Sequence, residues 1–161
     1  LASGYVHEAQ SISWPANDLK EAAPIKGRIV IVTSTDPAAN VELNTQVPAN
    51  VMWKIKGIQF NLVTDANVAN RRVHLNFGTE TVSVIECISG ATQAASLTRS
   101  YSAYPAGGIA ALSDDNDIII PIPDNLILIP DDTIQTLTVN RQTGDNFGTM
   151  KIWVERYYRP L

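Results

Sequence analysis

A run of acidic residues in the last third of the chain has the chemistry of a metal site. Asp114, Asp115, Asn116 and Asp117 are consecutive. Carboxylate and amide oxygens are the ligands that Ca²⁺ prefers in proteins. An EF-hand loop also needs a glycine and a distal glutamate in register, and both are missing here. We therefore take Asp114, Asp115 and Asp117 as calcium candidates, with a solvated acidic loop as the alternative.

The histidines and the cysteine are poorly placed for zinc binding or catalysis. Neither His7 nor His74 has a second histidine at metal-ligand spacing, so we expect no zinc site. His74 alternates with apolar residues, which predicts that it faces outward or onto a partner. Cys87 is the sole cysteine, lies in an apolar run and is expected to be a buried, inert thiol. No nucleophile-elbow motif supports a Ser, His and Asp triad.

Paired carboxylates are the remaining route to acid–base chemistry. Asp131 and Asp132 are adjacent, but they follow Pro130 at a strand corner, where turn chemistry explains aspartate. Glycoside hydrolysis needs two carboxylates that face one cleft, and this spacing does not indicate one. We therefore expect no catalytic residues, no cofactor and no enzymatic activity.

Aromatic side chains could instead bind a partner or a sugar. Tyr101 and Tyr104 flank a long loop predicted at 102–116, so we expect both to be exposed and to contact a partner. Trp53 and Trp153 lie mid-strand among apolar neighbours, where tryptophan more often belongs to the core. A carbohydrate-binding role for the two tyrosines stays open.

The elements that carry these residues are predicted to be short strands. The tract DIIIPIPDNLILIPDDTIQTLTVN, residues 117–140, contains apolar runs that are closed by prolines. Proline cannot donate to a ladder and breaks helices, so it marks strand ends, edges and bulges. Outside this tract, strands are predicted at Arg28–Thr33, Val51–Thr64, Arg72–Phe77, Thr81–Ile88, Ala95–Tyr101 and Phe147–Tyr158, with a loop or weak edge strand at Asp36–Asn50.

The longest of these patterns, Val51–Thr64, changes phase at Gly57. Val51, Trp53 and Ile55 share one face, and Ile58, Phe60 and Leu62 share the next set. A slip of one residue at a glycine predicts a β-bulge, which keeps both apolar sets on the core side.

The strand count predicts one all-β domain. Eight to nine strands with essentially no helix indicate an antiparallel two-sheet β-sandwich of jelly-roll type over residues 28–161. The loops at 36–50 and 102–116 are long enough for Greek-key crossings between the sheets.

Residues 1–27 are predicted to form an extended N-terminal arm outside the sandwich. Prolines and glycines punctuate this stretch, and no apolar period is sustained. Tyr5 and Trp14 would anchor the arm on a neighbouring subunit; a poorly ordered terminus is the alternative. The chain begins at Leu1 rather than Met, from which we expect processing or trimming.

The composition indicates which kinds of partner to expect. Charged residues make up only 17% of the chain, which predicts a surface covered by another subunit; a neutral Thr/Asn/Gln surface is the alternative. The net charge of −4 argues against nucleic-acid binding. The sequence contains no stretch of about 18 apolar residues, so we expect no membrane span.

Four segments combine strand corners and apolar runs in a specific order. They are WKIKGIQFNLVTDANVANRRV at 53–73, SGATQAASLTRSY at 89–101, PDNLILIPDDTI at 123–134 and GDNFGTMKIWVE at 144–155. Together they resemble a group of small virion structural proteins of tailed bacteriophages. The resemblance implies a β-sandwich that decorates the capsid or builds the neck, without catalysis. Asp131 departs from the pattern, since similar proteins tend to have glycine at this corner, and this suggests a different turn type.

The leading interpretation is therefore a non-enzymatic virion structural protein, a capsid decoration or cement protein that stabilises a bacteriophage particle through subunit contacts. Its partners would be the major capsid protein or other virion proteins, together with further copies of itself, with a trimer favoured. It would be located in the virion, after assembly in the host cytoplasm, without nucleic-acid or membrane partners. Two alternatives stay open: a receptor- or glycan-binding β-sandwich, such as a fibre or spike head domain, and a single jelly-roll capsid subunit.

Overall fold

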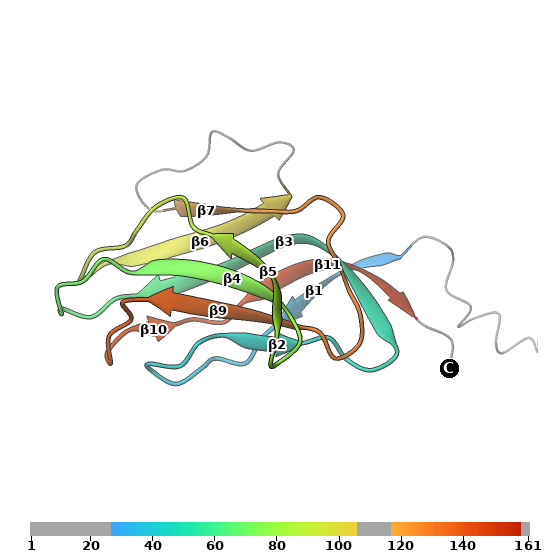
Figure 1. Ribbon diagram of the computed structural model, residues 1–161, viewed down its shortest axis with the longest axis horizontal. Coiled ribbons are helices and arrows are strands. Elements are labelled where there is room, and N and C mark those ends of the chain that lie inside the picture. The colour runs from blue at the N-terminus through green and yellow to red at the C-terminus, as the bar shows by residue number, and fades with distance from the viewer. Residues whose placement is uncertain (1–26, 106–116, 159–161) are drawn as a thin grey trace, which may run out of the picture.

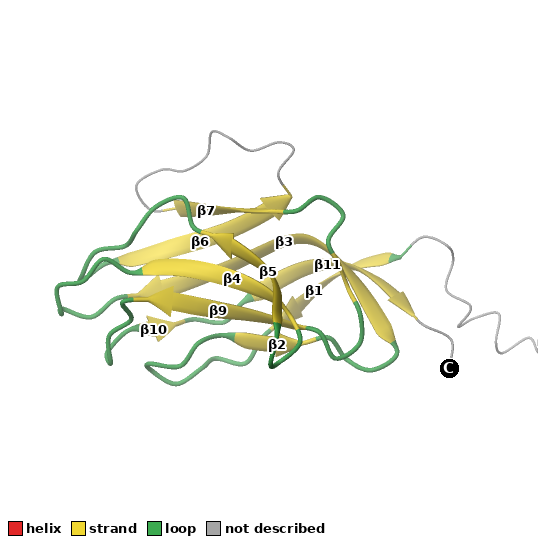
Figure 2. Ribbon diagram, viewed as in Figure 1, coloured by secondary structure: helices red, strands yellow, loops and turns green. Residues whose placement is uncertain are grey.

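The structure is a computed structural model that describes residues 27–105 and 117–158. Within these ranges the chain consists of strands and connecting loops, without a helix (Figure 1 and Figure 2). The strands form two sheets packed in two layers, which confirms the predicted all-β sandwich. The predicted arm, with Tyr5 and Trp14, lies outside the described residues except for Gly27.

The larger sheet, sheet A, has seven strands. Its main order is β1–β11–β3–β6–β7, and the short strands β8 and β10 pair with opposite ends of β3. The bounds are Arg28–Thr33 for β1, Lys151–Tyr158 for β11, Val51–Val63 for β3, Thr98–Pro105 for β6, Asp117–Ile122 for β7, Ile127–Leu128 for β8 and Asn146–Phe147 for β10. The closing strand expected at 147–158 is therefore split into β10 and β11.

The smaller sheet, sheet B, has four strands in the order β2–β9–β4–β5, all antiparallel to their neighbours. They are Asn44–Gln46, Thr133–Val139, Arg72–Gly78 and Ser83–Ile88. The short β2 is the predicted weak edge strand, and β4 and β5 form the predicted hairpin. Val73, Leu75 and Phe77 of β4 are buried, as their alternation with polar residues predicts.

One pair of strands differs from the predicted antiparallel arrangement, because β6 and β7 run parallel. A parallel pair cannot be joined by a tight turn, and the segment 106–116 connects these two strands. The loop predicted at 102–116 also begins too early. Strand β6 continues to Pro105, so Tyr104 belongs to a strand rather than to a loop.

The predicted bulge in β3 is present. Trp153 of β11 pairs with Gly57 and Val154 pairs with Ile55, so Lys56 is the extra residue on β3. The apolar residues before and after this point are buried, as the change of phase in the sequence requires. The bulge thus lets one long strand keep a continuous apolar face against sheet B.

A buried ion-pair network centred on Arg71 joins the loop after β3 to the loop before β10. The Arg71 side chain is 0% exposed, and its guanidinium donates to both carboxylate oxygens of Asp145 at 2.9 Å each. It also donates to the carboxylate of Asp65 and to the backbone carbonyls of Asn67 and Ala69. All five N–H groups of the guanidinium therefore have acceptors, which burial of this charge requires.

The carboxylate of Asp145 is held by the backbone as well as by Arg71. It accepts hydrogen bonds from the N–H of Asp65 at 3.0 Å and of Gln142 at 2.8 Å. Burial alone would raise the pKa of Asp145, but the hydrogen bonds and the positive charge of Arg71 outweigh it and hold this pKa below its usual value. The ionised carboxylate therefore stabilises the folded chain.

We expect Asp145→Asn to lower the free energy of unfolding by about 3 kcal/mol or more at pH 7, because the buried Arg71 loses a charged partner. Since the pKa of Asp145 is lower in the folded chain than in the unfolded one, its contribution is present above about pH 4 and is lost as the pH falls through the folded pKa. The difference between variant and wild type, measured by urea denaturation, should therefore shrink below about pH 4.

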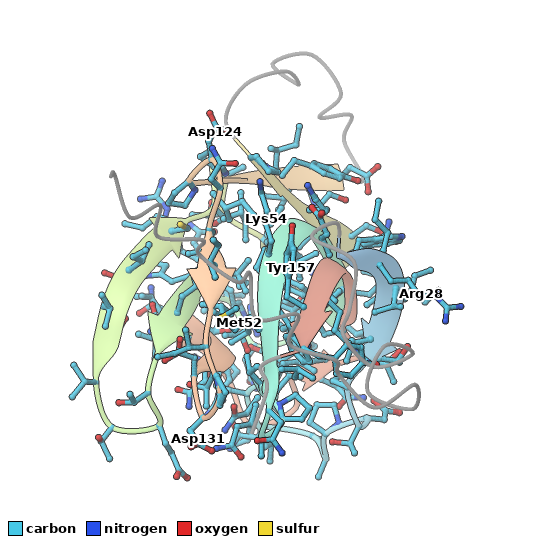
Figure 3. All side chains as sticks on the ribbon, turned by 90° about the vertical axis from the view of Figure 1, so that its right-hand side faces the viewer. Arg28, Met52, Lys54, Asp124, Asp131 and Tyr157 are labelled. Atoms are coloured by element: carbon cyan, nitrogen blue, oxygen red, sulfur yellow. The ribbon has the colours of Figure 1, made fainter. Side chains whose placement is uncertain are left out.

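Asp124→Asn is the control, since Asp124 lies exposed in the turn between β7 and β8 (Figure 3). This variant should change the free energy of unfolding little, both at pH 7 and below about pH 4. A difference between Asp145→Asn and wild type that stays constant across the acid range would contradict the role given to the ionised carboxylate.

Candidate interaction surfaces

Strand β9 places its side chains against the usual pattern of a half-buried strand. Thr136 and Thr138 face the core and are 3% and 7% exposed. Leu137 and Val139 face outward and are 46% and 44% exposed. A strand of a soluble protein normally shows the opposite alternation, with apolar side chains inward and polar side chains outward.

Glu42, in the loop between β1 and β2, makes the burial of the two threonines favourable. Its carboxylate accepts hydrogen bonds from the hydroxyl of Thr136 at 2.6 Å and from that of Thr138 at 3.2 Å. It also accepts the backbone N–H of Thr138 at 2.8 Å and pairs with Arg141 at 2.9 Å. The inward threonines are thus satisfied, and the outward direction of Leu137 and Val139, which alternate with them, is fixed.

These apolar side chains belong to a larger group on the outer face of sheet B, which we call the sheet B cluster. Its members are Val84 and Ile88 of β5 and Leu137 and Val139 of β9, all exposed. His74 of β4 lies between two of them, since it pairs with Ile88 on one side and with Leu137 on the other. The cluster therefore spans three neighbouring strands.

His74 lies on the outer face of sheet B, as its alternation predicts, although neighbouring side chains leave it only 12% exposed. Its Nδ1 is 2.7 Å from the carboxylate of Glu86 on β5, and its Nε2 is buried without a hydrogen-bond partner. His74 therefore also belongs to the sheet B cluster. Glu86 holds its Nδ1 in place, and its Nε2 is turned to the apolar neighbours.

A second apolar surface crosses the outer face of sheet A, and we call it the sheet A row. Register places Ile31 of β1 opposite Trp153 of β11, and Trp153 opposite Gly57 of β3. A Cβ atom on Gly57 would lie 3.2 Å from the ring of Tyr104, so this ring leans over the glycine. Tyr104 in turn pairs with Pro121 of β7. The row therefore crosses all five strands of the main order.

The row corrects the prediction for Trp153. Ile152 and Val154 on either side of it are fully buried, so the alternation of β11 turns Trp153 to the outer face, where it is half-buried. Trp53, by contrast, is 1% exposed and belongs to the core as predicted.

The prediction that Tyr101 is exposed is wrong, because Tyr101 lies mid-strand and points into the core. Its ring stacks on Phe60 of β3 with centroids 5.2 Å apart, and its hydroxyl donates to the side-chain carbonyl of Gln93 at 3.0 Å. Tyr101 therefore cannot bind a partner on the folded domain. Tyr104 is half-buried on the outer face and is available as a contact residue in the sheet A row.

The remaining candidates divide between described and undescribed parts of the chain. Asp114 and Asp115 lie outside the described residues, and Asp117 is the first residue of β7, opposite Ser100. In the part of the chain that the structure describes, no three His, Cys, Asp or Glu side chains gather as metal ligands would. Asp131 has a φ of 71°, in the region that glycine favours, so an aspartate at this corner does not itself require a different turn.

A shallow hollow lies beside the turn between β4 and β5, away from both tyrosines considered above. Its lining includes Asn76, Thr79 and Gln135.

Over residues 27–105 and 117–158, no helix is long and apolar enough to cross a membrane. No protein-family model matches the sequence, and the comparison with curated proteins found no match.

Cys87 is buried in β5, as predicted, and its thiol should react slowly. Desolvation, with a smaller effect from the charge of Glu86, raises the pKa of Cys87, so less thiolate is present near neutral pH. We expect native Cys87 to be alkylated by iodoacetamide at least about tenfold more slowly than in the urea-unfolded chain. The matched control is Val84→Cys in a Cys87→Ala chain, which places an exposed thiol on the same strand. Equal rates for native Cys87 and this control would contradict the burial.

Proposed function

We propose that the chain is a non-enzymatic virion structural protein, a capsid decoration or cement protein that stabilises a bacteriophage particle through subunit contacts. The observation that carries this proposal is the inverted alternation of β9. Leu137 and Val139 are 46% and 44% exposed on a strand whose threonines are buried, so a large part of each apolar residue is left in contact with water. Exposed apolar surface of this kind marks a contact with another protein.

Two surfaces, rather than one, suit a subunit of a shell. A ring or shell built from heterologous contacts joins one patch of a subunit to a different patch of its neighbour. The sheet B cluster and the sheet A row lie on the outer faces of the two opposite layers, so neighbours can contact both. The major capsid protein, other virion proteins and further copies of this chain, in a trimer, are the partners of the proposal, and the virion is its location.

The order of the strands supports a jelly-roll type for this sandwich. Taking β1, β2, β3, β4, β5, β6, β9 and β11 as the eight main strands, sheet A holds the first, eighth, third and sixth, and sheet B the second, seventh, fourth and fifth. The chain changes sheet at every main connection except the β4–β5 hairpin and thus interleaves two Greek keys, as jelly rolls do. The parallel strand β7 is an addition at the sheet A edge.

The same strand order favours one alternative, in which the chain is itself a single jelly-roll capsid subunit. In that case the two surfaces would contact only further copies of the chain. The receptor- or glycan-binding alternative loses part of its basis, because Tyr101 is buried and cannot form a binding platform with Tyr104.

Co-sedimentation with capsids tests the proposal. We expect the purified chain to pellet with phage capsids that lack it, and Leu137→Asp to weaken this binding at least about tenfold, because a charge replaces an apolar contact. Binding is measured as the fraction of chain in the pellet over a range of concentrations.

Val68→Asp is the matched control, since Val68 is 99% exposed in the loop between β3 and β4 and belongs to neither surface. It should bind as the wild type does. A wild-type chain that stays in the supernatant would contradict a decoration role. Self-assembly of the chain into closed shells would favour the capsid-subunit alternative, and binding to a glycan array that survives Leu137→Asp would favour the receptor-binding one.

A further inference from the structure

Strand β1 is an edge strand of sheet A that lacks the usual protection against pairing. Among the described strands, none pairs with the side of β1 that faces away from β11. Figure 3 shows Arg28, at the start of β1, pointing away from the molecule at this side. From Ile29 to Thr33 the strand carries no charge, no proline and no bulge, which are the features that normally block edge-to-edge pairing.

The other three edges of the two sheets carry such features. Strand β7 contains Pro121, which cannot donate a hydrogen bond to a neighbouring strand. Strand β2 is only three residues long. Strand β5 carries the charged Glu86 in its middle. This contrast indicates that, of the four edges, β1 is the one best suited to pair with a further strand.

The direction of the backbone groups of β1 follows from one hydrogen bond. The N–H of Ser34 donates to the carbonyl of Met150 at 2.9 Å, which continues the β1–β11 ladder. In an antiparallel pair, residues alternate between those that exchange hydrogen bonds with the neighbour and those whose N–H and C=O point away. Ile29, Ile31 and Thr33 therefore direct their N–H and C=O groups to the unpaired edge.

The side chains of β1 make this edge apolar on both faces. Ile29 and Ile31 are 65% and 59% exposed on the outer face. Val30 and Val32 point inward and pack partly buried against the core. A strand added at this edge would cover apolar side chains on both faces as well as satisfy the backbone groups.

We propose that the occupant of this edge is β1 of a second copy, paired antiparallel about a two-fold axis at Ile31. In this register Ile31 lies opposite Ile31 of the other copy, Val30 opposite Val32, and Ile29 opposite Thr33. Each pair joins residues on the same face of the sheet. The residues that direct their N–H and C=O groups to the unpaired edge lie opposite one another. The strand is thus complementary to itself.

Charge supports the same register. Arg28 falls opposite Ser34 of the other copy, so no like charges meet across the axis. Moving the axis to Val30 would place Arg28 opposite the inward-facing Val32 instead, where its charge would have to be buried. With the axis at Ile31, the sheet A row, which ends at this residue, continues through the axis into the row of the second copy.

This contact makes the proposed function more specific, because it identifies one of the partners as a second copy of the chain. Its place in a particle rests on the proposed function. A two-fold contact joins a patch to itself, whereas a trimer uses a heterologous contact. Both can therefore occur in one shell. Capsid binding and β1 pairing are measured separately, so failure of one is distinguishable from failure of the other.

Disulfide trapping in the full-length chain with Cys87→Ala tests the register. We expect Ile31→Cys to oxidise to a covalent dimer, because the Cα atoms of a hydrogen-bonded antiparallel pair lie about 5.5 Å apart, within the disulfide range. Ile29→Cys should not crosslink to itself but should crosslink to Thr33→Cys when the two variants are mixed. The matched control, Val68→Cys in the loop between β3 and β4, is at a site 99% exposed that belongs to neither surface, and it should stay monomeric on a non-reducing gel.

Light scattering of full-length variants tests the contact without a covalent trap. We expect the wild type to contain an even number of chains, Ile31→Lys to halve that mass and Val68→Lys to leave it unchanged, because only the first places like charges on the axis. Circular dichroism checks that both variants are folded. An Ile31→Cys chain that does not crosslink, a self-crosslinked Ile29→Cys chain, or an Ile31→Lys chain of wild-type mass would each overturn the proposed pairing.

Discussion

The guanidinium of Arg71 is removed from water, so its charge has to be balanced inside the protein, and this requirement fixes much of the surrounding structure. Asp145 and Asp65 supply the opposite charges from two loops that are far apart in the sequence. The backbone of Arg71 also exchanges hydrogen bonds with Gln93, at 2.9 and 2.8 Å, and the Gln93 side chain accepts the hydroxyl of Tyr101. One connected set of polar groups thus links two loops that join sheet A to sheet B with the core face of β6. We propose that the apolar side chains left on the outer faces of this frame contact a neighbour.

Much of the strand pattern could be predicted because its signals are local. The phase change at Gly57 predicts the bulge of β3, since a glycine and a slip of one residue both lie within the strand itself. The alternation of Val73, Leu75 and Phe77 predicts the buried face of β4 in the same way. Pro123, which directly follows the strand at Asp117–Ile122, acts on its own backbone, so the end of this strand also needs no knowledge of the fold.

The features that escaped prediction depend on partners distant in the sequence. In the sequence Arg71 is one of two adjacent arginines, and only the approach of Asp145 from 74 residues away makes it a buried charge. Leu137 and Val139 follow the strand pattern, but the outward direction of their side chains depends on Glu42, which satisfies the inward threonines from more than 90 positions away. Trp153 stands between two apolar residues, so the sequence offers no alternation from which to read its face.

Hydrogen–deuterium exchange of the wild-type chain, free and bound to capsids, tests the central claim that the outer faces are contact surfaces on a frame that is already complete. The account predicts slower exchange on binding in peptides that carry β9, whereas β1, which is already paired with a second copy in the free protein, should be protected in both states. The peptides around Arg71 and Asp145 should be protected to the same degree in both states, because their hydrogen bonds exist within the free chain. Exchange that is unchanged along β9, or slowed on binding only around the Arg71 network, would contradict it.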